Sequence, residues 1–194
     1  MTGTGQSGQR VLLVTGPSGA GRSTVLHALE DLSYEIIDNL PFSLIPRLLD
    51  GPPLSRPVAL GIDVRNRDFS AAGLIELIDR LTRLPEIAPE VLYLDCRPEV
   101  LVRRYNETRR RHPLAQDLPA AAGIAAEREL MEPLRRWADM VISTTQFTSN
   151  DLQQAIRERF LPGAPQTLTV SITSFGFARG MPPIADLVDR KSVV

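Results

Sequence analysis

The sequence predicts an α/β fold in which helices flank a parallel β-sheet. Short apolar runs alternate with longer segments of helical periodicity, a rhythm typical of parallel strands joined by crossover helices. With 194 residues, the chain is long enough for one well-buried domain and some remainder. Its hydrophobic content of 43% is ordinary for a globular protein, and its net charge of -1 gives no overall basic excess that would favour nucleic acid.

Six apolar runs are predicted as strands: residues 11–15, 34–37, 58–63, 91–95, 140–143 and 168–172. Residues 1–10 are rich in Gly, Ser, Thr and Gln, which predicts a flexible leader, and the main domain is expected over residues 11–161. The single cysteine, Cys96, forms no internal disulfide, and the N-terminal residues lack a secretion signal. No run is long enough to span a membrane, so a cytoplasmic protein is expected.

A helix is predicted after Asp68 or Ser70, either of which is a suitable N-cap, and it should end near Leu84. Its apolar stripe consists of Leu74, Leu77, Ile78 and Leu81. Another helix is expected to begin at Pro98, and a third to follow Thr148 and Ser149. We also expect Trp137 to pack a helix against the sheet.

A glycine-rich segment joins the first predicted strand to a helix and matches the phosphate-binding pattern G-x-x-x-x-G-K-[ST] except at one position. Its residues, all predicted to bind nucleotide, are Gly16, Pro17, Ser18, Gly19, Ala20, Gly21, Arg22 and Ser23. The glycines allow backbone N–H groups to point at phosphate oxygens, and the helix adds its positive N-terminal end. The segment therefore predicts a P-loop fold of the nucleoside triphosphatase type, with Ser23 as the Mg²⁺ ligand.

Arg22 stands where the pattern has lysine, and it is predicted to act in catalysis. Arginine keeps the positive charge but donates hydrogen bonds in a fixed planar fork, so nucleotide binding is expected to survive while hydrolysis slows. An acidic residue at a strand end usually orients the magnesium water shell, and three candidates stay open: Asp38, Asp63 and Asp95. The segment Leu92–Asp95 resembles the pattern of an apolar run followed by aspartate most closely, so Asp95 is the predicted catalytic carboxylate.

Five arginines crowd the predicted helix after Asp95 and its exit: Arg103, Arg104, Arg109, Arg110 and Arg111. Arginine forks clamp phosphoryl oxygens in the lids of small kinases, and they also bind RNA backbones. The alternative is a solvated helix face paired with Glu99 and Glu107. His27 and His112 fit no metal or catalytic-triad spacing and are expected to be structural.

Five segments together resemble the RapZ/YvcJ family of bacterial nucleotide-binding proteins: GPSGAGRST, LEDLSYEIIDNLP, GIDVRNRDF, LYLDCRPEVLVRRYNETRRRHPL and SFGFARGMP. The resemblance implies an adenylate-kinase-like domain that binds ATP and GTP and hydrolyses them slowly. It places ATP on the phosphate loop and a guanine nucleotide on Asp63, Val64, Arg65 and Asn66. It further implies an RNase adapter that presents a small regulatory RNA and controls amino-sugar synthesis through a C-terminal domain.

The chain departs from this family after the SFGF segment, where relatives continue through a whole further domain. Residues 162–194 are therefore expected to form a linker and the start of a truncated C-terminal domain. Three functions remain open: a regulatory protein with weak ATPase and GTPase activity, a small-molecule kinase, and an RNA-binding adapter. A protein partner and a homo-oligomer are further expectations.

Overall fold

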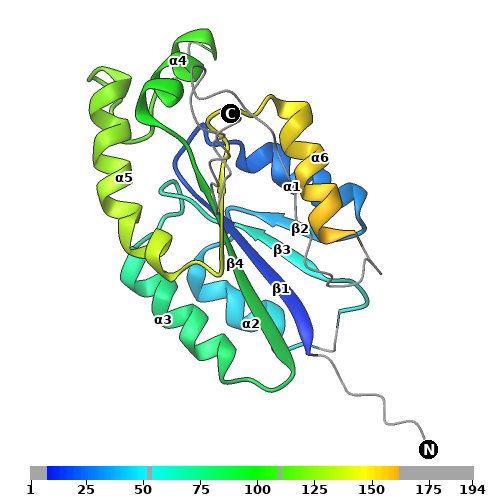
Figure 1. The fold of residues 1–194 in the computed structure, drawn as a ribbon. Helices are drawn as coiled ribbons and strands as arrows, with labels where there is room; N and C mark the ends of the chain where they lie inside the picture. Colours follow the sequence, from blue (N-terminus) through cyan, green and yellow to red (C-terminus); the bar gives the residue numbers. More distant parts are fainter. Residues whose placement is uncertain (1–7, 52–53, 109–110, 162–194) are drawn as a thin grey trace, which may run out of the picture.

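The computed structural model describes residues 8–51, 54–108 and 111–161, which fold into one parallel sheet covered by helices on both faces (Figure 1). The strands are β1 (Gln9–Thr15), β2 (Glu35–Asp38), β3 (Val58–Gly61), β4 (Ile87–Asp95) and β5 (Met140–Ser143). Their order in the sheet is β2-β3-β1-β4-β5, and every neighbouring pair is parallel. The predicted fold class is confirmed.

The helices are α1 (Arg22–Asp31), α2 (Ile45–Leu49), α3 (Ala71–Thr82), α4 (Pro98–Thr108), α5 (Ala120–Trp137) and α6 (Ser149–Phe160), with a short 3-10 turn, η1, at Phe42–Leu44. The central strand β1 shows how the two faces divide. Leu12 and Val14 pack with α1, α4 and α6. Val11 and Leu13 pack with α2, α3 and two buried residues of α5, Met131 and Leu134. Alternation along one strand thus builds two cores, one on each side of the sheet.

The sheet register sets the location of the functional edge. Val14 of β1 lies opposite Gly61 of β3 and Leu92 of β4, so these three strands end close to one another. In open parallel sheets, ligands bind beyond the carboxyl ends of the strands. The loop after β1 and the turns after β3 and β4 therefore meet at one edge.

The structure refines several sequence-based expectations. The first strand begins two residues earlier than predicted, β3 ends at Gly61 rather than at residue 63, and β4 begins at Ile87 rather than at residue 91. Trp137 is 47% exposed, so the expectation that it packs a helix against the sheet is wrong. It is the last residue of α5, where the helix leaves the core. The predicted strand at 168–172 and the predicted domain 162–194 lie outside the described residues.

Side-chain caps fix the starts of two helices. Ser70, not Asp68, caps α3, because its hydroxyl accepts a hydrogen bond from the Gly73 N–H at 3.0 Å. Thr148 and Asp151 form a reciprocal capping box at the start of α6. In the described part of the chain, no helix has the length and apolar character needed to cross a membrane.

We expect Ser70→Ala to lower the free energy of unfolding by about 1 kcal/mol, because an N–H of the first turn of α3 loses its acceptor. Urea denaturation followed by circular dichroism measures the loss. Ser43→Ala, at an exposed position, is the control and should change stability by less than about 0.5 kcal/mol. Equal effects of the two substitutions would contradict the assigned cap.

Candidate functional site

The loop between β1 and α1 has the backbone conformation that a phosphate cradle needs. Gly16, Gly19 and Gly21 have φ values of 142°, 89° and 106°, which residues other than glycine rarely adopt. Two of these glycines also permit close packing. A Cβ atom on Gly16 would collide with the carbonyl oxygen of Leu94, and one on Gly21 would lie 2.6 Å from Leu152 of α6. The glycine spacing therefore serves both backbone curvature and the fit of the loop between its neighbours.

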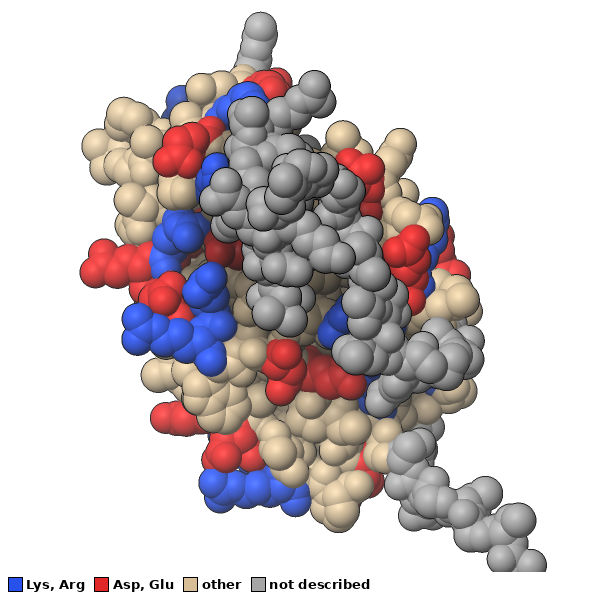
Figure 2. Space-filling model, in the orientation of Figure 1, with Lys and Arg blue, Asp and Glu red and all other residues tan. Residues whose placement is uncertain are grey.

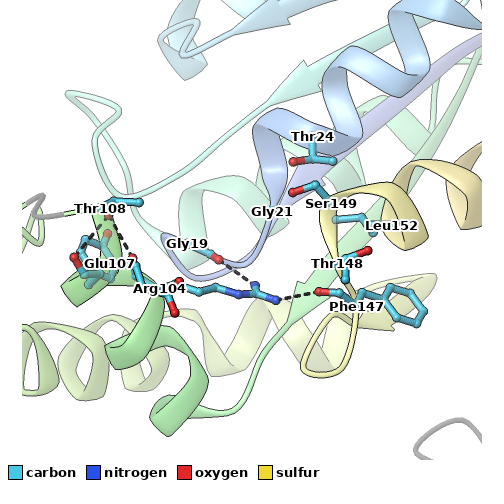
Figure 3. Close-up of a pocket in the computed structure, with 11 residues that line it drawn as sticks. Gly19, Gly21, Thr24, Arg104, Glu107, Thr108, Phe147, Thr148, Ser149 and Leu152 are labelled. Carbon is cyan, nitrogen blue, oxygen red and sulfur yellow. Dashed lines mark hydrogen bonds between the residues drawn. The ribbon is translucent and has the colours of Figure 1, made fainter.

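Two side chains hold the loop carbonyls from outside. The Arg104 guanidinium in α4 donates to the Gly19 carbonyl at 3.0 Å, and the buried Thr144 hydroxyl, after β5, donates to the Ala20 carbonyl at 2.8 Å. Arg104 also donates to the Thr144 carbonyl at 2.7 Å and to the Phe147 carbonyl at 3.3 Å. Figure 3 shows the guanidinium between Gly19 and Phe147. Arg104 thus joins the phosphate loop to the β5–α6 connection.

A buried carboxylate holds the loop from the side of α5. Glu127 accepts hydrogen bonds from the Ser18 backbone N–H at 2.9 Å and from the Ser18 hydroxyl at 2.7 Å. The His112 ring nitrogen Nε2 lies 3.0 Å from the same glutamate. Sequence reasoning did not single out Glu127.

The first residue of α1, Arg22, is 8% exposed and is paired with two carboxylates. One guanidinium nitrogen lies 2.5 Å from Asp63, and the other lies 3.4 Å from Asp38. Asp63 is itself 1% exposed, so this is a buried ion pair. The structure therefore brings together Arg22 and two of the three predicted strand-end aspartates.

The predicted guanine-nucleotide segment forms a hydrogen-bonded turn beside Arg22. Asp63 accepts from the Arg65 backbone N–H at 2.9 Å and from Arg65 Nε at 2.7 Å. The Asn66 side chain accepts from the Asp63 N–H at 3.1 Å and donates to the Leu40 carbonyl at 2.8 Å. Val64 is half-buried within this turn. The polar side chains of the segment are thus engaged with one another and with Arg22, and its nucleotide role stays a prediction.

The third aspartate, Asp95, contacts α5 and not Arg22. Its carboxylate lies 2.8 Å from Arg128 and 3.2 Å from Arg135. Partial burial opposes ionisation of this carboxyl, but the hydrogen bonds and charges of Arg128 and Arg135 outweigh it and hold the pKa of Asp95 below its usual value. The catalytic role predicted for Asp95 remains a prediction.

Ser23 is exposed at the N-terminus of α1, next to Arg22. Among the described residues, no group of three or more His, Cys, Asp or Glu side chains is placed to hold a metal ion. A magnesium ion carried by nucleotide phosphates needs only one or two protein oxygens, so the Ser23 hydroxyl is compatible with that mode of binding.

A pocket of about 420 Å³ opens beside the loop, between α4 and the start of α6. Its lining comes from the phosphate loop and α1, from α4, and from the β5–α6 connection with the start of α6. The lining residues are Gly19, Gly21, Thr24, Arg104, Tyr105, Glu107, Thr108, Phe147, Thr148, Ser149 and Leu152. Apolar and polar groups thus meet beside the loop (Figure 3), a combination typical of small-molecule pockets.

The arginine cluster does not act as one unit. Arg104 points into the site, whereas Arg103 is exposed and lies 3.9 Å from Glu107 on the same helix. Arg111 reaches the Gln116 carbonyl at 3.4 Å, and Arg109 and Arg110 lie outside the described residues. On the described part of the face shown in Figure 2, basic side chains (blue) and acidic side chains (red) lie interspersed. Arg103 thus fits the alternative of a solvated helix face paired with Glu107, whereas Arg104 donates to protein carbonyls, and a role of these arginines on phosphate or RNA stays a prediction.

Three residues that hold the loop were missed or assigned no role at the site by sequence reasoning: Thr144, Glu127 and His112. They contact the loop or each other at sequence separations of 124, 109 and 15 residues. A glutamate inside the apolar stripe of α5 was the one available signal, because a charged residue among buried positions requires a partner.

A glycine-rich loop joining the central strand to a helix, in a parallel sheet of order β2-β3-β1-β4-β5, defines a P-loop protein with a kinase-like fold. Shikimate kinase from Acinetobacter baumannii, in complex with shikimate, matches with a TM-score of 0.55 and 21% identity over 80% of this chain and 94% of that chain. YorR from Bacillus subtilis, in complex with phosphorylated GDP, matches with a TM-score of 0.52 and 19% identity over 77% and 94%. The family model of the RapZ-like N-terminal domain matches residues 9–164, and the chain belongs to this family.

Curated relatives support the same assignment. A protein of Novosphingobium aromaticivorans named nucleotide-binding protein is 55% identical over 186 residues, which cover 93% of this chain and 61% of the relative. A nucleotide-binding protein of Cereibacter sphaeroides is 54% identical over 179 residues, covering 92% of this chain and 60% of the relative. The chain thus spans about 60% of the length of these relatives. The resemblance inferred from five sequence segments is confirmed.

We expect Asp63→Asn to lower the free energy of unfolding by about 3 kcal/mol, because the buried Arg22 guanidinium loses its nearest carboxylate. Urea denaturation measures the loss, and Asp50→Asn, at an exposed position, is the control. If the two variants are equally stable, the Arg22–Asp63 pair does not hold this part of the site together.

Asp95 should contribute stability that depends on pH. Because its folded-state pKa is lowered, the contribution is present above pH about 4, where the unfolded carboxyl ionises, and is lost as pH falls through the folded-state pKa. The difference in unfolding free energy between the wild type and Asp95→Asn should be largest at pH 7 and shrink below pH about 4. Denaturant titrations at several pH values test this, with exposed Asp117→Asn as the control. A difference independent of pH would contradict the pairing with α5.

Proposed function

We propose that this chain binds ATP and GTP, with Mg²⁺, through the phosphate loop at 16–23, and that it hydrolyses them slowly. The observation that carries the proposal is the loop itself: three glycines with positive φ lead into α1, whose first residue is a buried arginine. The first N–H groups of a helix have no partner within the helix, and together with the helix dipole they favour a bound phosphate. The names of the curated relatives support nucleotide binding.

The pocket beside the loop supports a place for the nucleoside. It begins at Gly19 and Gly21 and extends to Phe147 and Leu152, so a triphosphate on the loop leaves its base facing the pocket. Arg104 borders the same space and has a planar guanidinium that stacks well on aromatic rings. The Ser23 hydroxyl would help to hold Mg²⁺, which would neutralise phosphate charge.

The slow turnover follows from the state of Arg22. Its guanidinium is already bound to Asp63 and Asp38, and a phosphoryl group would have to share it with these carboxylates. A fork held in this way orients phosphate oxygens but adapts less to a changing charge than a flexible ammonium does. The chain is therefore proposed to be a regulatory nucleotide binder, and the RNA partner, protein partner and homo-oligomer stay predictions.

Calorimetric titration with MgATP and MgGTP, with phosphate release measured in parallel, tests the proposal. Arg22→Ala should weaken triphosphate binding at least about tenfold, because one charge-assisted contact to phosphate is lost. Arg22→Lys should keep binding and raise turnover, because lysine places a compact charge at the same point.

Arg47→Ala, an exposed position in α2, is the matched control and should bind as the wild type does. Circular dichroism confirms that each variant is folded. Absence of nucleotide binding by the wild type at millimolar concentration would overturn the proposal, and unchanged binding by Arg22→Ala would remove Arg22 from the phosphate site.

A further inference from the structure

Glu127 is fully buried in the middle of α5, with 0% of its surface exposed. Glutamate is almost never buried to this degree unless hydrogen bonds or charges compensate for lost hydration. The phosphate-binding role proposed above does not use this residue. Its burial therefore needs an explanation of its own.

Both carboxylate oxygens of Glu127 are occupied. Oε2 accepts from the Ser18 backbone N–H at 2.9 Å and lies 3.0 Å from His112 Nε2, and Oε1 accepts from the Ser18 hydroxyl at 2.7 Å. Two of the three contacts thus go to the third residue of the phosphate loop. The remaining contact goes to the connection between α4 and α5.

The tautomer of His112 follows from its second contact. Its Nδ1 accepts a hydrogen bond from the Leu114 backbone N–H at 3.2 Å, so the proton of the neutral ring lies on Nε2 and is donated to Glu127. Gly123, one turn before Glu127, makes room for the ring, because a Cβ atom there would collide with His112 Nδ1. The Tyr105 ring also packs against the imidazole, with ring centroids 5.1 Å apart. The position of the imidazole is therefore fixed by two hydrogen bonds and by its packing against Gly123 and Tyr105.

We propose that Glu127 is a positioning residue for the phosphate loop, and that His112 links its position to the α4–α5 connection. By binding Ser18 from outside, the carboxylate fixes the first half of the loop while Arg104 and Thr144 fix the carbonyls of Gly19 and Ala20. Of the N–H groups that follow, that of Ala20 donates to the Pro17 carbonyl at 3.0 Å, and those at the start of α1 would face a phosphate. This inference rests on the proposed function, because it assigns Glu127 an effect on triphosphate affinity.

The connection also borders a second pocket, of about 610 Å³, lined in part by Tyr105, Arg111, His112 and Asp117. The chain of contacts from this pocket to the loop runs through two buried side chains, His112 and Glu127. Hydrogen bonds through His112 and Glu127 thus join the α4–α5 connection to Ser18.

Two substitutions of Glu127 separate positioning from simple packing. Glu127→Ala leaves the donors of Ser18 and His112 without an acceptor, and should weaken MgATP binding at least about tenfold. Glu127→Gln can place its carbonyl oxygen at the Oε2 position and donate its amide to the Ser18 hydroxyl, which is able to accept. It should therefore keep affinity within about threefold of the wild type.

Exposed Glu129→Ala, on the same helix, is the matched control. Affinities are measured by calorimetry at a temperature where circular dichroism shows every variant folded. A readout independent of nucleotide is the Ser18 amide signal in ¹H–¹⁵N spectra of the free protein, which should shift in Glu127→Ala and stay near its wild-type position in Glu127→Gln.

Weakened binding by folded Glu127→Ala, its rescue in Glu127→Gln and a displaced Ser18 signal would together support the proposal. Wild-type affinity in Glu127→Ala, or an unmoved Ser18 signal, would overturn it while leaving the proposed function intact. Loss of affinity in both variants, with only a lower melting temperature to accompany it, would reduce Glu127 to a packing role. Failure of the wild type to bind nucleotide would instead overturn the proposed function.

Discussion

The shape of the phosphate loop depends on hydrogen bonds that come from outside it. Glycines permit the curved backbone, but the loop is held in place by Glu127 on one side and by Arg104 and Thr144 on the other. These three side chains come from α5, from α4 and from the turn after β5. Unpaired buried carbonyls and N–H groups are costly, so satisfying them ties the loop to α4, to α5 and to the turn after β5.

The charged groups at this edge form two separate sets. Arg22, Asp63 and Arg65 make up one set around the start of α1. Asp95 and the arginines of α5 make up the other, and they fasten the end of β4 to α5. Each set pairs two arginines with one aspartate, and Asp38, 3.4 Å from Arg22, adds a second carboxylate to the first set. Incoming phosphate charge would thus share Arg22 with two carboxylates, and the helix terminus and backbone N–H groups would supply further attraction.

Much of the fold and part of the site follow from local patterns. The loop motif identified the β1–α1 connection, and the capping residues Ser70 and Thr148 marked helix starts, because both signals depend on neighbours in sequence. Asp38, Asp63 and Arg22 were each singled out from the sequence. Their ion pairing was not predicted, because it depends on side-chain geometry. Glu127 lies 109 positions from Ser18, and no spacing rule in the sequence connects two such residues.

The strand order has a consequence for how the protein is made. The central strand β1 pairs with β3 and β4, which the ribosome delivers much later, and the acceptor and donor groups that brace the loop come later still, from residues 127 and 144. Pairings distant along the chain are slow to form. The residues that carry the phosphate motif are thus synthesised well before the groups that brace them, and the cradle they form is completed only after nearly the whole domain has emerged.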